Sequence, residues 1–493
     1  MFQCQWQVLP LPPPKRLATS SASSCLRLPM LAIHSSNSSC SRRRFLTVGG
    51  LALGGLSLSS LCAARAASST SLETGKSVIF LFQQGGPSQF ETFDPKPEAP
   101  AEIRTVGGIT KTSLPGVLFG DTMQQLARHA DKFTVVRSFS TGNGGHNIQP
   151  IVGPDTLNTN IGSLYSSVVG ATHPTTSVPT NAVVFPQAVC SDVAKGQGRG
   201  DFAITGSVGA AFAPFIPGEG GNLQKDLRLN LTAERFKDRR ALLNGFDQLR
   251  DESEGESQFR DFDRGQRQAC EVLLSGAVAT ALDLSREDPK VLARYDTAQY
   301  VASHNWTRSA RGKKGYYTGH AKSMGKALLL ARRLCEAGCG FVTIHTGYEG
   351  VWDMHADGNN LNMKDGMEAV GRSFDHAVAA FIEDLESRGM SEKIMLVATG
   401  EMGRTPRLNK NGGRDHWAKL APLLLYGGGA ARGKVIGQST KDGGEAASDN
   451  VGAPNLISTI MHTTFDMGLV RLKPALSSIS KLGEPNPIPG VLG

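Results

Sequence analysis

The stretch Ser77-Val78-Ile79-Phe80-Leu81-Phe82 is a short, continuous apolar run, bounded by Gly75 before it and by Gly85-Gly86-Pro87 after it. An apolar run of this length without polar alternation is typical of a strand that is buried on both faces, as strands of parallel sheets are. The glycines and the proline interrupt regular structure and set its ends. We therefore expect residues 77–82 to form a strand inside a parallel sheet.

Further strands and helices alternate along the chain. Apolar runs predict strands, and apolar residues at helical spacing predict helices. The strands are expected at 133–136, 181–185, 341–344, 393–398 and 422–425, and the helices at 121–131, 363–388 and 455–467. This alternation is typical of an α/β fold in which a mostly parallel sheet has helices on both faces. A further helical pattern at about 219–335 is interpreted as an insertion that covers the site.

The charge of the chain is concentrated at its start. The formal net charge is +8, from 52 basic and 44 acidic residues, yet residues 1–66 contain seven Lys or Arg and no Asp or Glu. The rest of the chain therefore carries 45 basic and 44 acidic residues and is close to neutral. A basic surface that would attract nucleic acid is not indicated, so we expect no nucleic-acid partner.

The basic segment has the order of an export signal. The twin-arginine pattern Ser41-Arg42-Arg43-Arg44-Phe45-Leu46-Thr47 is followed by a Gly-rich, weakly apolar stretch and by Ala64-Arg65-Ala66, an A-x-A cleavage signal. We expect residues 1–66 to be a leader read by the twin-arginine export machinery, and residues 67–493 to be a single periplasmic or secreted domain. The apolar stretch is broken by Gly and Ser, so we expect no stable membrane anchor.

Four cysteines follow the leader: Cys190, Cys270, Cys335 and Cys339. A zinc site would require a second pair or nearby histidines at suitable spacing, and the sequence has none. We interpret these residues as buried single cysteines. A disulfide between Cys335 and Cys339, across a helix end, is the alternative.

Polar residues collect after three of the expected strands. In open α/β sheets, sites form beyond the carboxyl ends of the strands. The three segments are Gln83 to Pro97, then His345 to Asp357, which includes Trp352-Asp353-Met354-His355, and then Thr399 to Trp417, which includes Glu401, Arg404, Arg414 and His416. Carboxylates and imidazoles at neighbouring strand ends can bind a divalent cation, and oxygen and nitrogen donors suit Zn, Mn, Mg or Ca.

Each of these residues also has a structural interpretation. Asp353 could cap the segment after it, His355 could be an exposed loop residue, and Glu401 could pair with a nearby arginine. Asp415 and His416 could form a hydrogen-bonded pair, and His146 could lie in a flexible loop because glycines flank it. Because several such residues follow strand ends together, a shared functional site is favoured over separate structural roles.

The sequence contains neither a complete nucleotide-binding P-loop nor the nucleophile motif of α/β-hydrolases. Gly428 to Val435 nearly spells a P-loop, but Val435 stands where a Ser or Thr must reach Mg²⁺. The sequence also lacks a Gly-x-Ser-x-Gly elbow, so an α/β-hydrolase triad is not expected.

Taken together, the motifs resemble an exported bacterial family of unknown function that is related to the alkaline phosphatase/sulfatase superfamily. The motifs are the twin-arginine leader, Gly85 to Ser88 with Thr92 to Pro97, Trp352 to His355, Gly400 to Arg407 and Gly412 to Trp417. The resemblance implies an α/β/α sandwich with a mixed, mostly parallel sheet, and one or two metal ions at the carboxyl ends of its strands.

The resemblance also assigns roles to particular positions. It implies metal ligation by Asp353, His355 and His416. Glu401-Met402 stands where the superfamily usually has Asp-His, and Gln83 and Gln84 occupy the place of an acidic ligand. The nucleophile is expected near Ser138 to His146, a region without the Cys-x-Pro-x-Arg of formylglycine sulfatases.

These observations lead to two functional hypotheses. The first is an exported metal-dependent hydrolase of phosphate or sulfate esters, acting on a small molecule or on extracellular polysaccharide. Its expected site comprises the metal ligands Asp353, His355, Glu401 and His416, the anion-binding residues Arg404 and Arg414, and the catalytic candidates Ser138, Ser140, Thr141 and His146. The second is a non-catalytic exported binding protein with a degenerate metal site.

Overall fold

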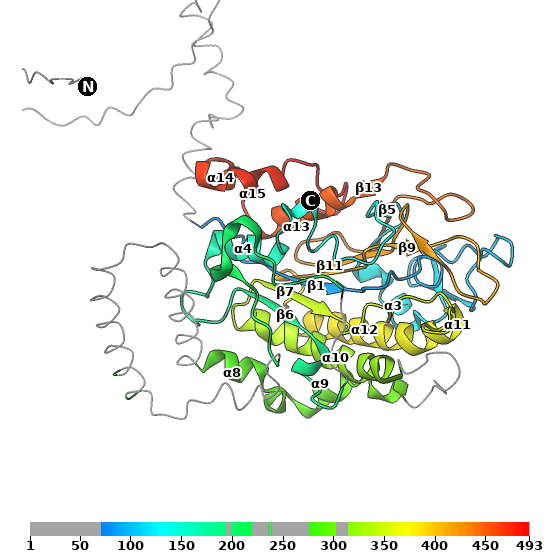
Figure 1. Ribbon diagram of the computed structural model, residues 1–493, viewed down its shortest axis with the longest axis horizontal. Coiled ribbons are helices and arrows are strands. Elements are labelled where there is room, and N and C mark those ends of the chain that lie inside the picture. Colours follow the sequence, from blue (N-terminus) through cyan, green and yellow to red (C-terminus); the bar gives the residue numbers. More distant parts are fainter. Residues whose placement is uncertain are drawn as a thin grey trace, which may run out of the picture. The chain divides into compact units, whose positions relative to one another are not determined.

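The apolar run at residues 77–82 forms strand β1 (Ser77–Phe82) near the middle of a seven-stranded sheet (Figure 1). The computed structural model describes residues 71–193, 199–218, 276–301 and 314–492, together with Arg235 and Asp238. The expected leader and most of the expected insertion at about 219–335 lie outside these ranges. All statements about structure below concern the described residues.

The sheet is mixed and mostly parallel. Its order is β12-β4-β11-β8-β1-β7-β6, and β11 is the one antiparallel strand among these seven. Besides β1, the strands are β4 (Thr134–Val136), β6 (Asn181–Val184), β7 (Phe341–His345), β8 (Ile394–Thr399), β11 (Leu423–Gly427) and β12 (Lys434–Ile436). The expectation of an α/β fold with a mostly parallel mixed sheet is confirmed.

The three central strands are parallel neighbours. In register, Phe82 of β1 lies beside His345 of β7 and beside Thr399 of β8. The carboxyl ends of these strands therefore lie at the same edge of the sheet. The polar loops that follow them start side by side, as the sequence predicts.

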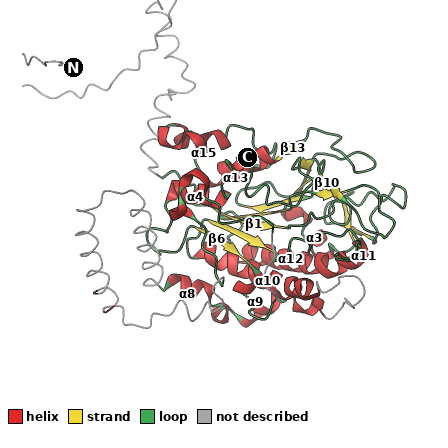
Figure 2. Cartoon of the chain, in the orientation of Figure 1, coloured by secondary structure: helices red, strands yellow, loops and turns green. Residues whose placement is uncertain are grey.

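Helices cover both faces of the sheet (Figures 1 and 2). One face, with Val78, Phe80 and Phe82, packs against α4, α13, α14 and α15, and the other, with Ile79 and Leu81, packs against α3, α8, α10 and α12. Burial of each such side chain contributes about 1.5–3 kcal/mol. The helices are α3 (Gln124–Arg128), α4 (Ile161–Val169), α8 (Ala277–Leu282), α9 (Pro289–Arg294), α10 (Lys314–Glu336), α11 (Met363–Gly366), α12 (Arg372–Ser387), α13 (Ala453–Thr464), α14 (Met467–Arg471) and α15 (Ser477–Leu482).

The long helix expected at 363–388 is continuous, with a local change of hydrogen bonding. It begins as α11, passes through a π-helical turn at Met367–Gly371 and continues as α12. The side chain of Asn362 caps its start by accepting a hydrogen bond from the N–H of Asp365 over 2.8 Å. Along this helix the apolar side chains of Phe374, Val378 and Phe381 face the core, so the predicted apolar face is the buried one.

Three small two-stranded sheets shape the loops beyond the main sheet. They pair β9 (Gly403–Arg404) with β10 (His416–Trp417), β5 (Phe139–Ser140) with β13 (Val451–Gly452), and β2 (Ile109–Lys111) with β3 (Leu118–Gly120). The β9–β10 pair holds the segment after β8 in a hairpin. One of the expected site residues, His416, lies on that hairpin.

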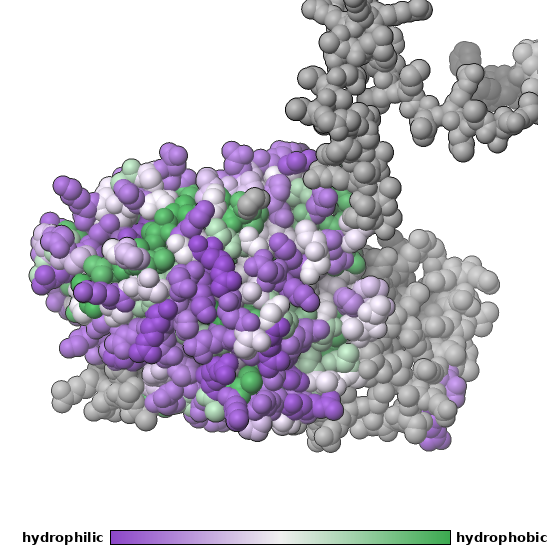
Figure 3. Space-filling model, turned by 180° about the vertical axis from the view of Figure 1, so that it is seen from behind, coloured by the Kyte–Doolittle hydropathy of each residue, from purple (hydrophilic) through white to green (hydrophobic). Residues whose placement is uncertain are grey.

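The described cysteines and the surface agree with a globular domain. Cys335 and Cys339 are buried free thiols, as the sequence favours, and Cys190 is a half-buried one. Figure 3 shows that the face seen there is mostly hydrophilic. Among the described helices, none is both long enough and apolar enough to span a membrane.

Candidate metal centre

Asp353 lies in the loop after β7, and a buried tryptophan holds this loop in place. Trp352 is fully buried, and its ring contacts Phe374 of α12 edge-on, with 5.6 Å between the ring centroids. Asp353 itself is 5% exposed, and its backbone N–H donates to the backbone O of Gly350 over 3.1 Å. The anchored loop therefore presents the Asp353 carboxylate at a fixed position beyond the sheet.

His416 reaches the same position from the β9–β10 hairpin. It pairs with Arg404 across the hairpin, and the backbone N–H of Arg414 donates to the backbone O of Met354 over 3.1 Å. This hydrogen bond joins the hairpin to the loop that carries His355. The Nε2 atoms of His355 and His416 lie 2.8 Å apart.

His146 comes from a third segment, the glycine-rich stretch between β5 and α4. Its Nε2 lies 3.0 Å from Oδ2 of Asp353. The backbone O of Gly144, in the same segment, lies 3.0 Å from Nδ1 of His416. Three segments that are far apart in the sequence therefore meet at one carboxylate.

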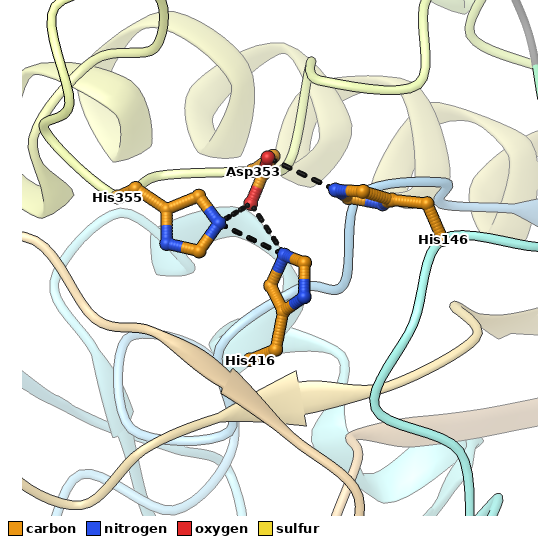
Figure 4. Close-up of side chains that lie close together, drawn as sticks. All are labelled: His146, Asp353, His355 and His416. Atoms are coloured by element: carbon orange, nitrogen blue, oxygen red, sulfur yellow. Dashed lines mark hydrogen bonds and ion pairs between the residues drawn. The ribbon is translucent and has the colours of Figure 1, made fainter.

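The carboxylate of Asp353 is the centre of this group (Figure 4). Nε2 of His355 and Nε2 of His416 lie 2.8 and 3.2 Å from Oδ1, while His146 contacts Oδ2. One donor atom from each of the four residues lies within 4.8 Å of the other three. Ligands held about 2.0–2.2 Å from a tetrahedral zinc ion are themselves roughly 3.3–3.6 Å apart. The donors of Asp353, His355 and His416 are grouped closely enough for one ion, slightly nearer to one another than bound ligands would be, with His146 at the edge of the group.

The second nitrogen of each ring contacts a hydrogen-bond acceptor. These contacts join His146 Nδ1 to Glu401 Oε1 at 3.1 Å, His355 Nδ1 to Asp415 Oδ1 at 3.2 Å, and His416 Nδ1 to the Gly144 O at 3.0 Å. A neutral imidazole that donates from Nδ1 has its lone pair on Nε2. All three Nε2 lone pairs would then face Asp353, an arrangement that a cation stabilises and that is typical of histidines that bind metals.

Burial and neighbouring charged groups shift the pKa values of these residues in opposite directions. Burial lowers the pKa of His146, but hydrogen bonds to Asp353 and Glu401 outweigh it and raise that pKa to about 9. Burial also opposes protonation of His355, whose pKa is nevertheless raised by Asp353. Burial raises the pKa of Asp353, whereas the charge of Arg404 and the histidine hydrogen bonds hold it well below its usual range. The ionised carboxylate therefore attracts a cation, either protons on the rings or a metal ion between them.

Glu401, which the sequence suggests as a ligand, lies outside the group of four. Its carboxylate is fully buried and accepts the backbone N–H of Gly85, with 2.9 Å from the nitrogen to Oε1. It also contacts Nδ1 of His146. In this structure Glu401 therefore orients a histidine, and it is not one of the four residues whose donor atoms cluster.

The two arginines expected to bind an anion are fully buried, and their donors are used within the protein. Arg404 donates to Oδ1 of Asp353 over 2.7 Å and to backbone carbonyls that include those of Gly86 and Trp352. Arg414 donates to Oε1 of Glu91 over 3.0 Å and to several backbone carbonyls. The assignment of an anion clamp to Arg404 and Arg414 is not supported by this geometry, because the recorded hydrogen bonds of both guanidiniums go to protein groups.

The hydroxyl groups proposed as nucleophiles belong to Ser138, Ser140 and Thr141. Ser138 is fully buried, and Ser140 Oγ donates to Oδ1 of Asn450 over 3.0 Å. Thr141 Oγ1 donates to the backbone O of Glu401. Among the described residues, none of these three hydroxyls is recorded in contact with Asp353 or its histidines.

One neighbour of the centre had no signal in the sequence. The side-chain amide of Asn360 donates to Oδ2 of Asp353 over 3.1 Å. Asn360 lies seven residues further along the same loop, and nothing in its local pattern distinguishes it from other loop asparagines. Asn360 reaches Asp353 because the loop turns back on itself between the two residues.

The donor set indicates which ions would fit. Three imidazole nitrogens and one carboxylate oxygen suit Zn²⁺ and similar transition ions, whereas Ca²⁺ and Mg²⁺ prefer sites built from oxygen. The set contains no sulfur ligand. The residues present therefore fit a divalent metal ion of the zinc type.

Comparisons with solved structures find weak matches. "Crystal structure of Ps i-CgsB" has 10% identity and a TM-score of 0.30, over 79% of this chain and 71% of that one. A sulfatase, PsFucS1 from Pseudoalteromonas sp., has 10% identity and a TM-score of 0.29, over 79% and 67%. The alkaline phosphatase of the Antarctic bacterium TAB5 has 11% identity and a TM-score of 0.26, over 83% and 98%. Likeness at these TM-scores says nothing about the chemistry of this chain.

Sequence comparisons give a family but no activity. Comparison with curated proteins yields no significant match. The family model described as "Protein of unknown function (DUF1501)" matches residues 75–470, which span β1 and the candidate metal centre. The chain therefore belongs to the DUF1501 family.

Proposed function

We propose that this protein is an exported, metal-dependent hydrolase whose divalent ion is held by His146, Asp353, His355 and His416. The observation that carries the proposal is the orientation of the three imidazoles. Each directs Nε2 at one carboxylate while an acceptor contacts its Nδ1. Such outer contacts fix the tautomer that binds a metal.

The proposed ion is zinc or a similar transition metal. When bound, such an ion polarises an ester oxygen and lowers the pKa of a bound water. The protein supplies the charge balance: Arg404 contacts Asp353 and offsets its negative charge. A divalent ion at this carboxylate would therefore retain net positive charge, which favours anionic substrates such as phosphate or sulfate esters.

The class of substrate follows from the leader and the motifs. The twin-arginine pattern at Arg42 and Arg43 would bring the enzyme to the periplasm or the outside of the cell. Esters on extracellular polysaccharides or their fragments are available there. The resemblance of the motifs to the alkaline phosphatase/sulfatase superfamily supports ester hydrolysis over other reactions of a metal-bound water.

One observation favours a non-catalytic binding protein as the second candidate. Four protein donors can complete a tetrahedral ion, and closed sites of this kind are structural, whereas catalytic zinc keeps a position open. His146 decides between the two candidates. If it ligates a tetrahedral ion, no position remains for a substrate, so hydrolysis with all four residues as ligands requires an ion that takes a fifth ligand.

The test uses protein purified after export, without added chelator. Metal content per chain is measured together with hydrolysis of 4-nitrophenyl phosphate and 4-nitrophenyl sulfate. We expect about one transition-metal ion per chain and activity on one of the esters, both lost in His355→Ala. The matched control is His129→Ala, which removes a histidine that pairs with Glu383 away from the centre. Metal that is bound without hydrolysis of either ester would favour a binding protein with a closed metal site. A metal-free protein would contradict the proposed hydrolase and favour a binding protein with a degenerate site.

A further inference from the structure

The carboxyl end of β1 continues into a buried glutamine, Gln84, whose side chain reaches across to two other segments. Gln84 is 0% exposed. Its Nε2 donates to the backbone O of Asn147 and to the backbone O of Arg199, each over 2.8 Å. Its Oε1 accepts the backbone N–H of Arg199 over 3.2 Å and contacts Nε2 of His345 at 2.8 Å. All four hydrogen-bonding positions of this amide are therefore occupied.

His345, at the end of β7, fixes the direction in which this amide points. Nδ1 of His345 accepts the backbone N–H of Gly347 over 3.0 Å, so the proton of the neutral ring is on Nε2. Complete burial lowers the pKa of His345 to about 3, which keeps the ring neutral. The Nε2–H must find an acceptor, and Gln84 Oε1 is that acceptor. The amide nitrogen of Gln84 consequently faces the carbonyls of Asn147 and Arg199.

The contact with Asn147 matters because this residue follows His146. The segment of residues 141–149, here called the His146 loop, contains three glycines. Glycine gives the backbone many alternative conformations, so a loop rich in it loses much entropy when it is ordered. A buried, fully paired amide is a contact strong enough to select one conformation.

We propose that Gln84 is a positioning residue that holds the His146 loop, and with it the His146 ring, against Asp353. The resemblance to the superfamily would place an acidic metal ligand near this end of the first strand. In this chain the residue there binds backbone, and the side chain it helps to deliver is a histidine from another segment. The identity of the bound ion rests on the proposed function, whereas the loop contact does not.

The first measurement is amide hydrogen exchange of the metal-free, full-length protein. Gln84→Met removes both donated hydrogen bonds without adding charge and keeps a similar volume. Gln84→Glu is the second variant, because it keeps the acceptor for His345 but loses both donors. Both should speed exchange in the His146 loop at least tenfold, while β1 and β7 stay protected. Unchanged exchange in this loop in a folded variant would overturn the proposal.

The matched control is Gln89→Met. Gln89 is also buried, and its Nε2 donates to two backbone carbonyls, those of Arg404 and Gly443, but it has no recorded contact with the His146 loop. This control should leave exchange in residues 141–149 as in the wild type. Equal acceleration in the control would show that any lost buried amide loosens the loop, and would overturn the specific role of Gln84.

The second measurement is the affinity for Co²⁺ or Zn²⁺ alone. Loss of a residue that supports a metal ligand weakens metal binding by about 10- to 100-fold, and we expect this for Gln84→Met. In the background of His146→Ala, Gln84→Met should have no further effect, because both act through one ring. Additive losses would overturn the proposal. Protein that binds no metal would contradict the proposed function, and the exchange experiment would still decide the role of Gln84.

Discussion

Acid should destabilise this protein in part through His345, a histidine that the fold keeps neutral. Complete burial lowers its pKa to about 3, against about 6.5 for an exposed histidine. Below about pH 6.5 the unfolded chain therefore takes up a proton that the folded chain does not. The stability that neutral His345 contributes is fully present above pH 6.5 and is lost as the pH falls towards 3.

The size of the effect follows from the shift. One proton bound only by the unfolded state changes the free energy of unfolding by about 1.4 kcal/mol per pH unit. Because the unfolded chain is already half protonated at pH 6.5, this residue alone should remove about 2.3 kcal/mol between pH 6.5 and pH 4.5. The His345→Gln variant keeps a side chain that can donate to Gln84 but has no group that titrates in this range.

The assay is urea unfolding of wild type and His345→Gln at half-unit steps from pH 4.5 to pH 7.5, with chelator present. The difference between their free energies of unfolding should change by about 2.3 kcal/mol from pH 6.5 to pH 4.5, with the wild type losing more. Other groups cancel in this difference. Parallel curves for the two proteins would refute the reasoning, because they would mean that His345 is protonated in the folded state.

Three further predictions concern export, the partner of Asp353 and a glycine beside it. Replacing Arg42 and Arg43 together by lysine should leave the uncleaved precursor in the cytoplasm, as fractionation and immunoblotting would show, and normal export would contradict the twin-arginine interpretation. Arg404→Met removes the buried cation that contacts Asp353; we expect the free energy of unfolding to fall by about 3–5 kcal/mol in urea titrations, and a change below about 1 kcal/mol would show that the pair is unimportant. Gly85→Ala should lower the melting temperature and the metal content, because φ is +113° there and a Cβ would lie 2.7 Å from the backbone N of Asp353; a variant as stable as the wild type would contradict this.

The sheet could be predicted from the sequence because its strands are buried on both faces. Such strands appear as mostly apolar runs, and β1, β7 and β8 are of this kind. Helix α4 was not expected from the sequence. Its residues Ile161–Val169 include a glycine and three serines, and their burial comes from packing against the sheet, which no local pattern records.

The candidate site could be predicted only in part. Asp353, His355 and His416 lie at strand ends, and this rule of topology can be applied to a sequence. The burial of Arg404 and Arg414 could not be predicted, because their partners are mostly backbone carbonyls of distant segments. A charged residue in a loop has the same local pattern whether it faces solvent or supports the loops around it.

His146 is a further residue whose contacts could not be predicted from the sequence. The glycines just before it make it a residue of interest, but its distance from Asp353 in the sequence gives no indication of contact. The structure brings the two together through contacts of the backbone of its loop with Gln84 and His416. Side chains that bind a loop through its backbone leave no pattern in the sequence of the loop.

The position of the ion is the most direct test of the proposed metal centre. Crystals of the wild-type protein, soaked in zinc, would be measured at the zinc absorption edge. We predict one anomalous peak at about 2.0–2.2 Å from Oδ1 of Asp353 and from Nε2 of His146, His355 and His416. An absence of any peak within 4 Å of Asp353, or a peak held by other residues, would contradict the account.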